Sequence, residues 1–247
     1  MRDSYESFAS ELSKFTAPVF ILPSLDSNID QIIANGTLTL IDTGRAKVWV
    51  TCRHVWECFH EEQKRNPDAV ICAYLGREFG GFCFKKLEVL DESKALDLVI
   101  FYPPIETTGT KSDRIYFRIP RWPISRIRVG ETITVLGYPG CCRQRIGNVY
   151  EFGFSFVGYR VSSVSERHFA LANEGQNRTY LFNDSDSKEP LSMAGMSGGP
   201  AFAFRPGWVE LVGLLYEGFD SHNSLFLSHA LFLRENGTLD HAKIPPA

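Results

Sequence analysis

The chain has 247 residues, of which 44% are hydrophobic and 22% are charged, and its formal net charge is -3. This composition is typical of a folded globular protein, and the negative balance argues against a surface built for nucleic acid or an acidic membrane. No apolar run reaches the roughly 18 residues that a membrane span needs. Residues 1–15 carry acidic side chains where a secretory signal would have an apolar core, so we expect a cytoplasmic protein.

Residues 3–15 predict a short amphipathic helix, with Asp3 as its cap. Its apolar face consists of Tyr5, Phe8, Leu12 and Phe15. Two roles stay open for it: a helix packed on the body of the protein, or a partner-binding or autoinhibitory element.

Short β-branched or aromatic stretches separated by turn residues dominate the rest of the chain. They predict strands at 17–23, 36–42, 46–52, 68–75, 81–90, 96–102, 131–138, 149–159, 168–172, 179–183, 200–204, 209–216 and 224–231. One helical patch interrupts them, from His54 to about Arg65. Many short strands at this spacing favour an all-β barrel or sandwich.

The expected organisation is two β-rich halves joined by a connector. The segments are the helix at 1–16, a first half at 17–113, a connector at 114–130, a second half at 131–232 and a tail at 233–247. The connector is rich in arginine and contains two prolines. We expect it to be solvated, because few aromatic residues accompany its basic side chains as they would in a nucleic-acid patch.

Six cysteines are present, and two of them, Cys141 and Cys142, are neighbours that rarely bridge each other. In a reducing compartment most of the six are expected to be free, buried thiols.

The stretch AGMSGGPAF, residues 194–202, places Ser197 within a glycine-rich turn. In the structural interpretation, this segment is only a turn before a strand. In the functional interpretation, Ser197 is a nucleophile whose attack on a carbonyl creates an oxyanion, and an oxyanion needs backbone N–H donors aimed at one point. Gly195 and Ser197 could supply those donors.

A serine hydroxyl needs a base within hydrogen-bonding reach, and the base needs an orienting group. His54 follows the strand AKVWVTC, which would place its imidazole at a rim. Asp97 stands in the apolar stretch LDLVIF, where a carboxylate is costly to bury unless it is hydrogen-bonded.

The order His54, Asp97, Ser197, together with GTLTLIDTGRAKVWVTCRHV, IRVGETITVLGYPG and LVGLLYEG, resembles the trypsin-like serine peptidases over residues 17–230. Within that family, the motifs most resemble those of bacterial high-temperature-requirement protease domains. No appended peptide-binding domain is expected. The resemblance implies two six-stranded antiparallel β-barrels with a cleft between them.

The same resemblance assigns roles to residues. Ser197 would be the nucleophile, His54 the general base and acid, and Asp97 the group that orients the imidazole, with an oxyanion hole at Gly195 and Ser197 and no cofactor. The substrate-binding positions would be Leu191, Leu215, Tyr216, Glu217 and Gly218. With Leu191 near the base of the primary pocket, we expect a small or apolar side chain there, although the charge of Glu217 at the rim opposes this. A protein or peptide substrate is implied.

Two features of the sequence bear on activation. Met196 stands where an aspartate often pairs with a freed amino terminus, so the family's zymogen switch is not expected. The polar segment 173–192 leads into the Ser197 turn, and its ordering by substrate or a regulatory protein could set activity.

Two rival functions stay open. Cys52, His54, Cys58 and His60 form C-x-H-x-x-x-C-x-H, which could bind zinc and would then occupy the proposed base. Alternatively, the chain could be a catalytically silent protein-binding module that keeps the fold.

Overall fold

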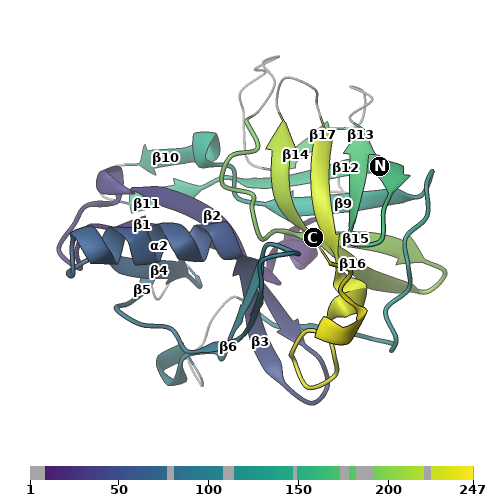
Figure 1. The fold of residues 1–247 in the computed structure, drawn as a ribbon. Helices are drawn as coiled ribbons and strands as arrows, with labels where there is room; N and C mark the ends of the chain where they lie inside the picture. The colour runs from purple at the N-terminus through teal and green to yellow at the C-terminus, as the bar shows by residue number, and fades with distance from the viewer. Residues whose placement is uncertain are drawn as a thin grey trace.

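The structure is a computed structural model. It describes residues 9–76, 81–107, 114–146, 149–172, 178–181, 192–219 and 224–246. Two β-rich halves lie side by side, the first with one long helix on its surface (Figure 1).

The first half is a rolled sheet in the order β5-β4-β1-β2-β3-β7-β6, with β8 added in parallel to β2. Its strands are β1 Thr16–Leu22, β2 Ala34–Asp42, β3 Lys47–Cys52, β4 Val70–Tyr74, β5 Gly81–Phe84, β6 Val89–Ser93, β7 Leu98–Phe101 and β8 Phe117–Arg118. Every residue of β1 is buried, as its apolar sequence leads one to expect of a strand covered on both faces.

The second half closes into a barrel. The path β13-β17-β16-β15-β9-β12 returns to β13 through a direct β12–β13 pairing, and β14 adds to β12 outside this ring. The strands are β9 Thr132–Gly137, β12 Phe154–Val164, β13 His168–Ala172, β14 Arg178–Leu181, β15 Pro200–Arg205, β16 Trp208–Phe219 and β17 Ser224–His229. The predicted all-β double-barrel class is therefore confirmed.

A hairpin of β10 Arg143–Ile146 and β11 Val149–Phe152 extends from the second half toward the first. Phe152 stacks on Phe20 of β1 with 5.3 Å between ring centroids. Gly153 ends the hairpin where a Cβ would lie 2.5 Å from the Cβ of Cys142. The predicted strand 149–159 is consequently two strands.

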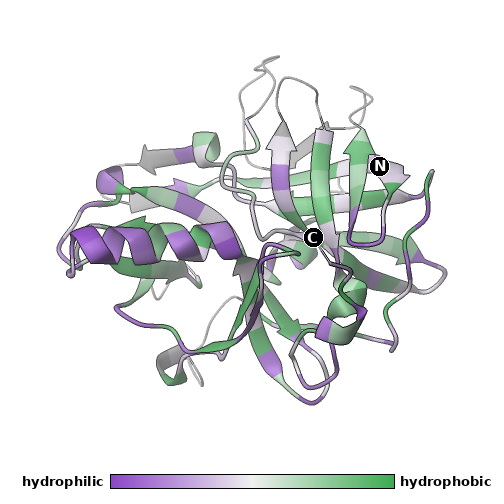
Figure 2. Ribbon diagram, viewed as in Figure 1, coloured by the Kyte–Doolittle hydropathy of each residue, from purple (hydrophilic) through white to green (hydrophobic). Residues whose placement is uncertain are grey.

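The helix α2, Arg53–Arg65, confirms the predicted helical patch. It buries Val55, Trp56 and Phe59 against the first half and presents a hydrophilic outer face (Figure 2). Residues 9–13 are also helical, and Ala9 and Leu12 are buried in the core, as a packed amino-terminal helix requires. Of the rest of that predicted helix, residues 3–8 lie outside the described residues, and residues 14–15 form a turn. The short 3-10 helices are Ile29–Gln31, Ile105–Thr107, Gly140–Cys142, Ala230–Phe232 and His241–Lys243.

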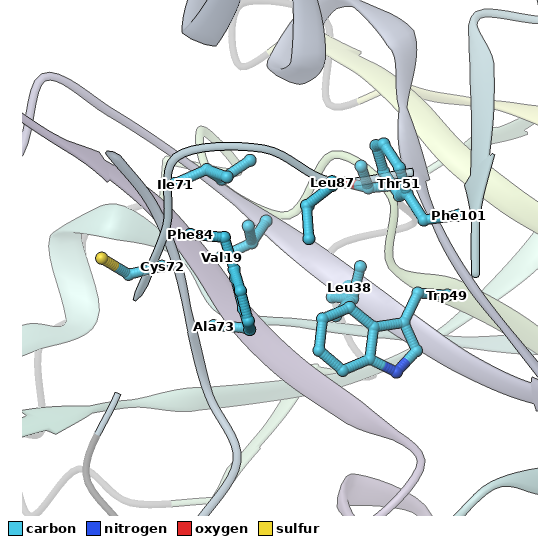
Figure 3. Close-up of a pocket in the computed structure, with 10 residues that line it drawn as sticks. All are labelled: Val19, Leu38, Trp49, Thr51, Ile71, Cys72, Ala73, Phe84, Leu87 and Phe101. Atoms are coloured by element: carbon cyan, nitrogen blue, oxygen red, sulfur yellow. The ribbon is translucent and has the colours of Figure 1, made fainter. Parts of the chain in front are cut away.

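The interior of the first half contains an apolar pocket (Figure 3). Its lining residues are Val19, Leu38, Trp49, Thr51, Ile71, Cys72, Ala73, Phe84, Leu87 and Phe101. The hydroxyl of Thr51 already donates to the carbonyl of Thr37. The pocket therefore offers a ligand few hydrogen bonds and is best understood as part of the core.

Two sequence-based expectations are corrected here. The stretch 81–90 is two strands, β5 and β6, because residues 85–88 leave the sheet between them. Cys72 and Cys83 face each other across β4 and β5 and form a disulfide, so not all thiols are free. Of the remaining four cysteines only Cys52 is buried. No helix in the described ranges is long and apolar enough to cross a membrane.

Candidate active site

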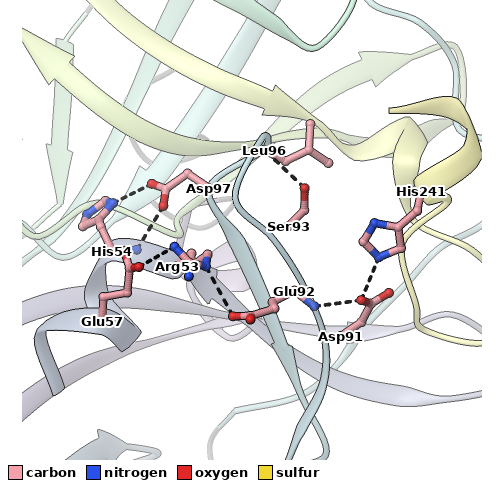
Figure 4. A network of polar contacts seen from close by, with 9 residues as sticks. All are labelled: Arg53, His54, Glu57, Asp91, Glu92, Ser93, Leu96, Asp97 and His241. Carbon is pink, nitrogen blue, oxygen red and sulfur yellow. Dashed lines mark hydrogen bonds and ion pairs between the residues drawn. The ribbon is translucent and has the colours of Figure 1, made fainter. Parts of the chain in front are cut away.

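His54 is held at the point where strand β3 turns directly into α2. Cys52 is the N-cap residue, and His54 is the second residue of the helix. The backbone N–H of Arg53 donates to the carbonyl of Asp97 at 3.0 Å. The guanidinium of Arg53 pairs with Glu57 and, at 3.3 Å, with Glu92 (Figure 4). The helix start is thus held to β6 through Glu92 and to the β6–β7 turn through Asp97.

Asp97 contacts His54 through both carboxylate oxygens. Oδ2 lies 2.5 Å from Nδ1 of the ring, and Oδ1 accepts the backbone N–H of His54 at 3.0 Å (Figure 4). The second contact satisfies one of the free N–H groups at the helix start, where a negative charge is also favoured. The Asp97 side chain is 26% exposed and that of His54 is 45% exposed, so the pair faces solvent on the His54 side.

The backbone of Asp97 is itself unusual. Its φ is +51°, and among the described residues no other non-glycine residue has a positive φ. Aspartate tolerates this conformation better than most residues, but it still costs free energy. Such strain is typical of functional sites, where the surrounding structure over-determines a residue's position.

Cys52 lies directly behind this pair and is fully buried. Its thiol donates to the carbonyl of Leu215 at 3.1 Å. Burial raises the pKa of the Cys52 thiol well above its usual value, and the negative charge of Asp97 raises it further. Cys52 is therefore a neutral hydrogen-bond donor at neutral pH.

The predicted C-x-H-x-x-x-C-x-H zinc group is not supported. Within the described residues, one set of metal-ligating side chains converges here, and it consists of Cys52, His54 and Asp97. Cys58 and His60 lie farther along α2, and the ring of His60 packs on Trp56 at 4.2 Å between centroids. A helix starting at residue 53 carries these two side chains away from the turn that holds Asp97.

The turn that carries Ser197 is clamped by the first half of the protein through its carbonyl groups. Two buried threonines of β2 make these contacts. The Oγ1 of Thr37 donates to the carbonyl of Gly195 at 3.0 Å, and the N–H of Thr37 donates to the carbonyl of Ser197 at 2.8 Å. The Oγ1 of Thr39 donates to the carbonyl of Gly198 at 2.7 Å.

The second half completes this clamp at the start of the turn. The N–H of Gly140 donates to the carbonyl of Ala194 at 2.8 Å. In the described part of the chain, no acceptor pairs with the backbone N–H groups of Gly195 and Ser197. With the carbonyls bound, these two donors are left available at one end of the turn.

Two glycines of this turn are required by its geometry. Gly195 has φ +96°, and a Cβ there would stand 2.0 Å from Nδ2 of Asn35. Gly198 has φ +92°, and a Cβ there would stand 2.2 Å from the carbonyl oxygen of Thr37. The close approach between the two halves therefore explains the glycines around Ser197.

Ser197 and His54 approach the same part of β2. A Cβ at Gly36 would lie 3.0 Å from Val55, the residue after His54, and 3.2 Å from the carbonyl oxygen of Ser197. No hydrogen bond joins the side chains of Ser197 and His54 in the described residues. In ligand-free enzyme sites, hydrogen bonds between catalytic groups are often long and tighten only with substrate, so the absence of this bond does not exclude the two residues as partners.

The predicted substrate-binding strand lies at the end of β16. Within the described residues, β15 pairs with β16 as far as Leu214, and the N–H and C=O of Leu215 are hydrogen-bonded to Gly199 and Gly198. Residues 216–219 therefore have β17 on one side and no described backbone partner on the other. Tyr216 packs its ring on His168 at 4.7 Å between centroids. A Cβ at Gly218 would contact Leu225 at 3.0 Å and Met193 at 3.3 Å.

Leu191, the expected pocket base, lies outside the described residues. Met193, Thr37 and Thr39 are the residues that sequence reasoning did not assign to the site, whereas Cys52 entered it only as a ligand of the rival zinc group. The alternating threonines of GTLT are the signal that could have pointed to β2, because hydroxyls on one face of a buried strand need partners.

Known structures share this architecture. A thermostable serine protease, AL20, from an extremophilic microorganism matches at 13% identity with a TM-score of 0.51, covering 89% of this chain and 92% of that one. Deg5 matches at 15% identity with a TM-score of 0.47, covering 90% of this chain and 88% of that one. No model of a known protein family matches, and no curated protein sequence matches. The chain has the trypsin-like fold.

Proposed function

Proceeding from this fold, we propose that the chain is a serine endopeptidase that hydrolyses peptide bonds through an acyl-enzyme on Ser197. The observation that carries the proposal is the double contact of Asp97 with His54. One oxygen fixes the backbone of His54 and the other fixes its ring at Nδ1, which leaves Nε2 as the nitrogen that faces a substrate.

The proposed chemistry follows from the His54 tautomer that carries its proton on Nδ1. Nε2 of His54 takes the proton of the Ser197 hydroxyl as Oγ attacks the substrate carbonyl. Asp97 stabilises the imidazolium that forms. His54 then gives the proton to the leaving amine, and a water molecule repeats the sequence to release the acid and regenerate Ser197.

The bound carbonyls of the turn support an oxyanion hole at Gly195 and Ser197. An N–H group stabilises a developing negative charge best when it is already oriented and has no competing acceptor. Thr37 and Gly140 hold the neighbouring carbonyls, so the two donors need no rearrangement before attack.

The free side of residues 216–219 supports substrate binding by strand addition, in which backbone hydrogen bonds hold an extended peptide. Met193 and Leu225 beside Gly218 favour a small or apolar side chain in the primary pocket. A substrate is therefore expected to be an extended protein segment with an apolar residue before the cleaved bond.

The test is covalent labelling with a fluorophosphonate probe, which reacts with activated serines. We expect labelling of the wild type, loss of labelling in Ser197→Ala and His54→Ala, and full labelling in Ser162→Ala, an exposed serine on β12. Labelling that survives Ser197→Ala would contradict the proposal. Absence of labelling in the wild type, with no cleavage of peptide libraries, would favour the silent binding module.

A further inference from the structure

Three side chains that can bind a metal ion, one soft thiol and two harder ligands, lie close together at the His54 site. The sulfur of Cys52, a ring nitrogen of His54 and a carboxylate oxygen of Asp97 all lie within 4.8 Å of one another. A thiol, an imidazole and a carboxylate are the three ligand types that zinc prefers. Neither the fold nor the peptidase chemistry requires a thiol at this position.

The spacing is close to what a tetrahedral cation needs. Zinc bonds of about 2.0 to 2.3 Å imply ligand atoms about 3.3 to 3.7 Å apart. The sulfur has to approach by about 1 Å at most, and the Nδ1 and Oδ2 atoms, now 2.5 Å apart, have to separate by about 1 Å. Both movements involve side chains alone, beside the start of α2.

The charge of the three side chains and the access of water to them also suit a divalent cation. A thiolate and a carboxylate together neutralise a divalent cation, which lowers the cost of holding that charge beside the buried Cys52. The Asp97 side chain, which contacts Nδ1, is 26% exposed, so water can reach a fourth position on a cation bound there, the arrangement of a zinc site with three protein ligands.

We propose that Cys52, His54 and Asp97 form a binding site for Zn²⁺ or a comparable thiophilic divalent cation that switches the His54 site off. Binding releases the thiol proton and moves the ring proton of His54 from Nδ1 to Nε2. The nitrogen that would accept the proton of Ser197 then carries one already, so the general base is lost. The switching rests on the proposed peptidase function, whereas the binding itself does not.

The first experiment measures binding directly, with Co²⁺ as a spectroscopic probe. The full chain carries Cys58→Ser, Cys141→Ser and Cys142→Ser, so that the other free thiols do not contribute, and it is compared with the same chain carrying Cys52→Ser as well. We expect one Co²⁺ per chain, with a thiolate charge-transfer band and the intense visible bands of four-coordinate Co²⁺. Zn²⁺ should displace it.

Cys52→Ser should weaken Co²⁺ binding by more than about 100-fold, because losing a ligand exceeds the 10- to 100-fold typical of losing an outer-shell partner. If this variant does not fold, Asp97→Asn removes a different ligand and should have the same effect. Equal Co²⁺ affinity with and without these side chains, or a spectrum without a thiolate band, would overturn the site.

The second experiment repeats fluorophosphonate labelling of the Cys52-containing chain with Zn²⁺ and then with a chelator. Zn²⁺ should block labelling, the chelator should restore it, and the Cys52→Ser chain should need over about 100-fold more Zn²⁺. Labelling that persists with Zn²⁺ bound would overturn the switch. A chain that binds Co²⁺ through Cys52 but is never labelled would retain the metal site and contradict the peptidase.

Discussion

The hydroxyl of Thr37, on the first half, donates to the carbonyl of Gly195, on the second, across 158 positions of sequence. The same oxygen accepts the N–H of Tyr138 at 3.0 Å. One buried side chain therefore joins β2, the end of β9 and the turn of the proposed nucleophile.

Thr37→Val keeps the shape of this side chain and removes its hydrogen bonds. The carbonyl of Gly195 and the N–H of Tyr138 lose their partner, so the free energy of unfolding should fall by about 1 to 3 kcal/mol. Because the oxyanion donors lose their support, kcat should fall by about 10-fold, less than for direct removal of a donor.

Thr43→Val is the matched control for that change. Thr43 is also buried and also donates to backbone carbonyls, but to that of Ala46 in its own turn and that of Glu235 near the carboxyl end. The Thr43→Val variant should be less stable than the wild type but should keep the wild-type kcat. Equal effects of the two substitutions on kcat would show that Thr37 acts on stability alone.

Asp97→Asn tests the orientation of His54 without breaking the backbone. Asparagine tolerates a positive φ and can still accept the N–H of His54. Its amide, however, favours the wrong imidazole tautomer, so kcat should fall about 10⁴-fold while the protein stays folded. Peptidase assays and a thermal melt measure the two effects separately. A variant with wild-type kcat would exclude Asp97 from the catalytic group.

Gly198→Ala and Gly207→Ala separate steric clash from backbone strain. Both glycines have a positive φ, but nothing lies within 4 Å of a Cβ at Gly207. Gly207→Ala should cost about 1 kcal/mol of stability from the left-handed backbone alone. Gly198→Ala adds the clash with the carbonyl of Thr37 and should cost several times more. Denaturant unfolding of the two variants gives the comparison, and equal costs would mean that the turn yields easily.

His168 should make stability depend on pH. Burial, together with the positive charge of Arg167, lowers the pKa of His168 from 6.5 to about 4. As pH falls, the unfolded chain takes up the proton first, so stability is lost between about pH 6.5 and pH 4. The loss should be about 1 to 2 kcal/mol, since the imidazole is only half-buried.

The measurement compares wild type with His168→Phe, which retains an aromatic ring against Tyr216. The difference in unfolding free energy between about pH 7 and about pH 4.5 should be smaller in the variant. An identical pH dependence would remove His168 as its source.

Much of the architecture could be predicted from sequence because its signals are local. Apolar runs bounded by turn residues mark β1, β3 and β7, and the helical period after His54 marks α2. A histidine at a strand end and an aspartate beside an apolar run each need a partner, and the resemblance to the trypsin-like peptidases predicts that His54 and Asp97 pair, as they do.

The contacts that were missed depend on register between distant strands. Cys72 meets Cys83 only because β4 and β5 pair in one register, and a shift by one residue would put them on opposite faces. Cys52 reaches the carbonyl of Leu215 only once the two halves are docked. Spacing along the chain carries no information about either contact.

The clamp between the threonines of β2 and the Ser197 turn means that the two halves do not have to unfold for function to fail. A small separation of the halves on heating would release the carbonyls of the turn while each β-structure stays intact. Heat inactivation should then precede the melting of secondary structure and reverse on cooling. The docking of the two halves would set the upper working temperature.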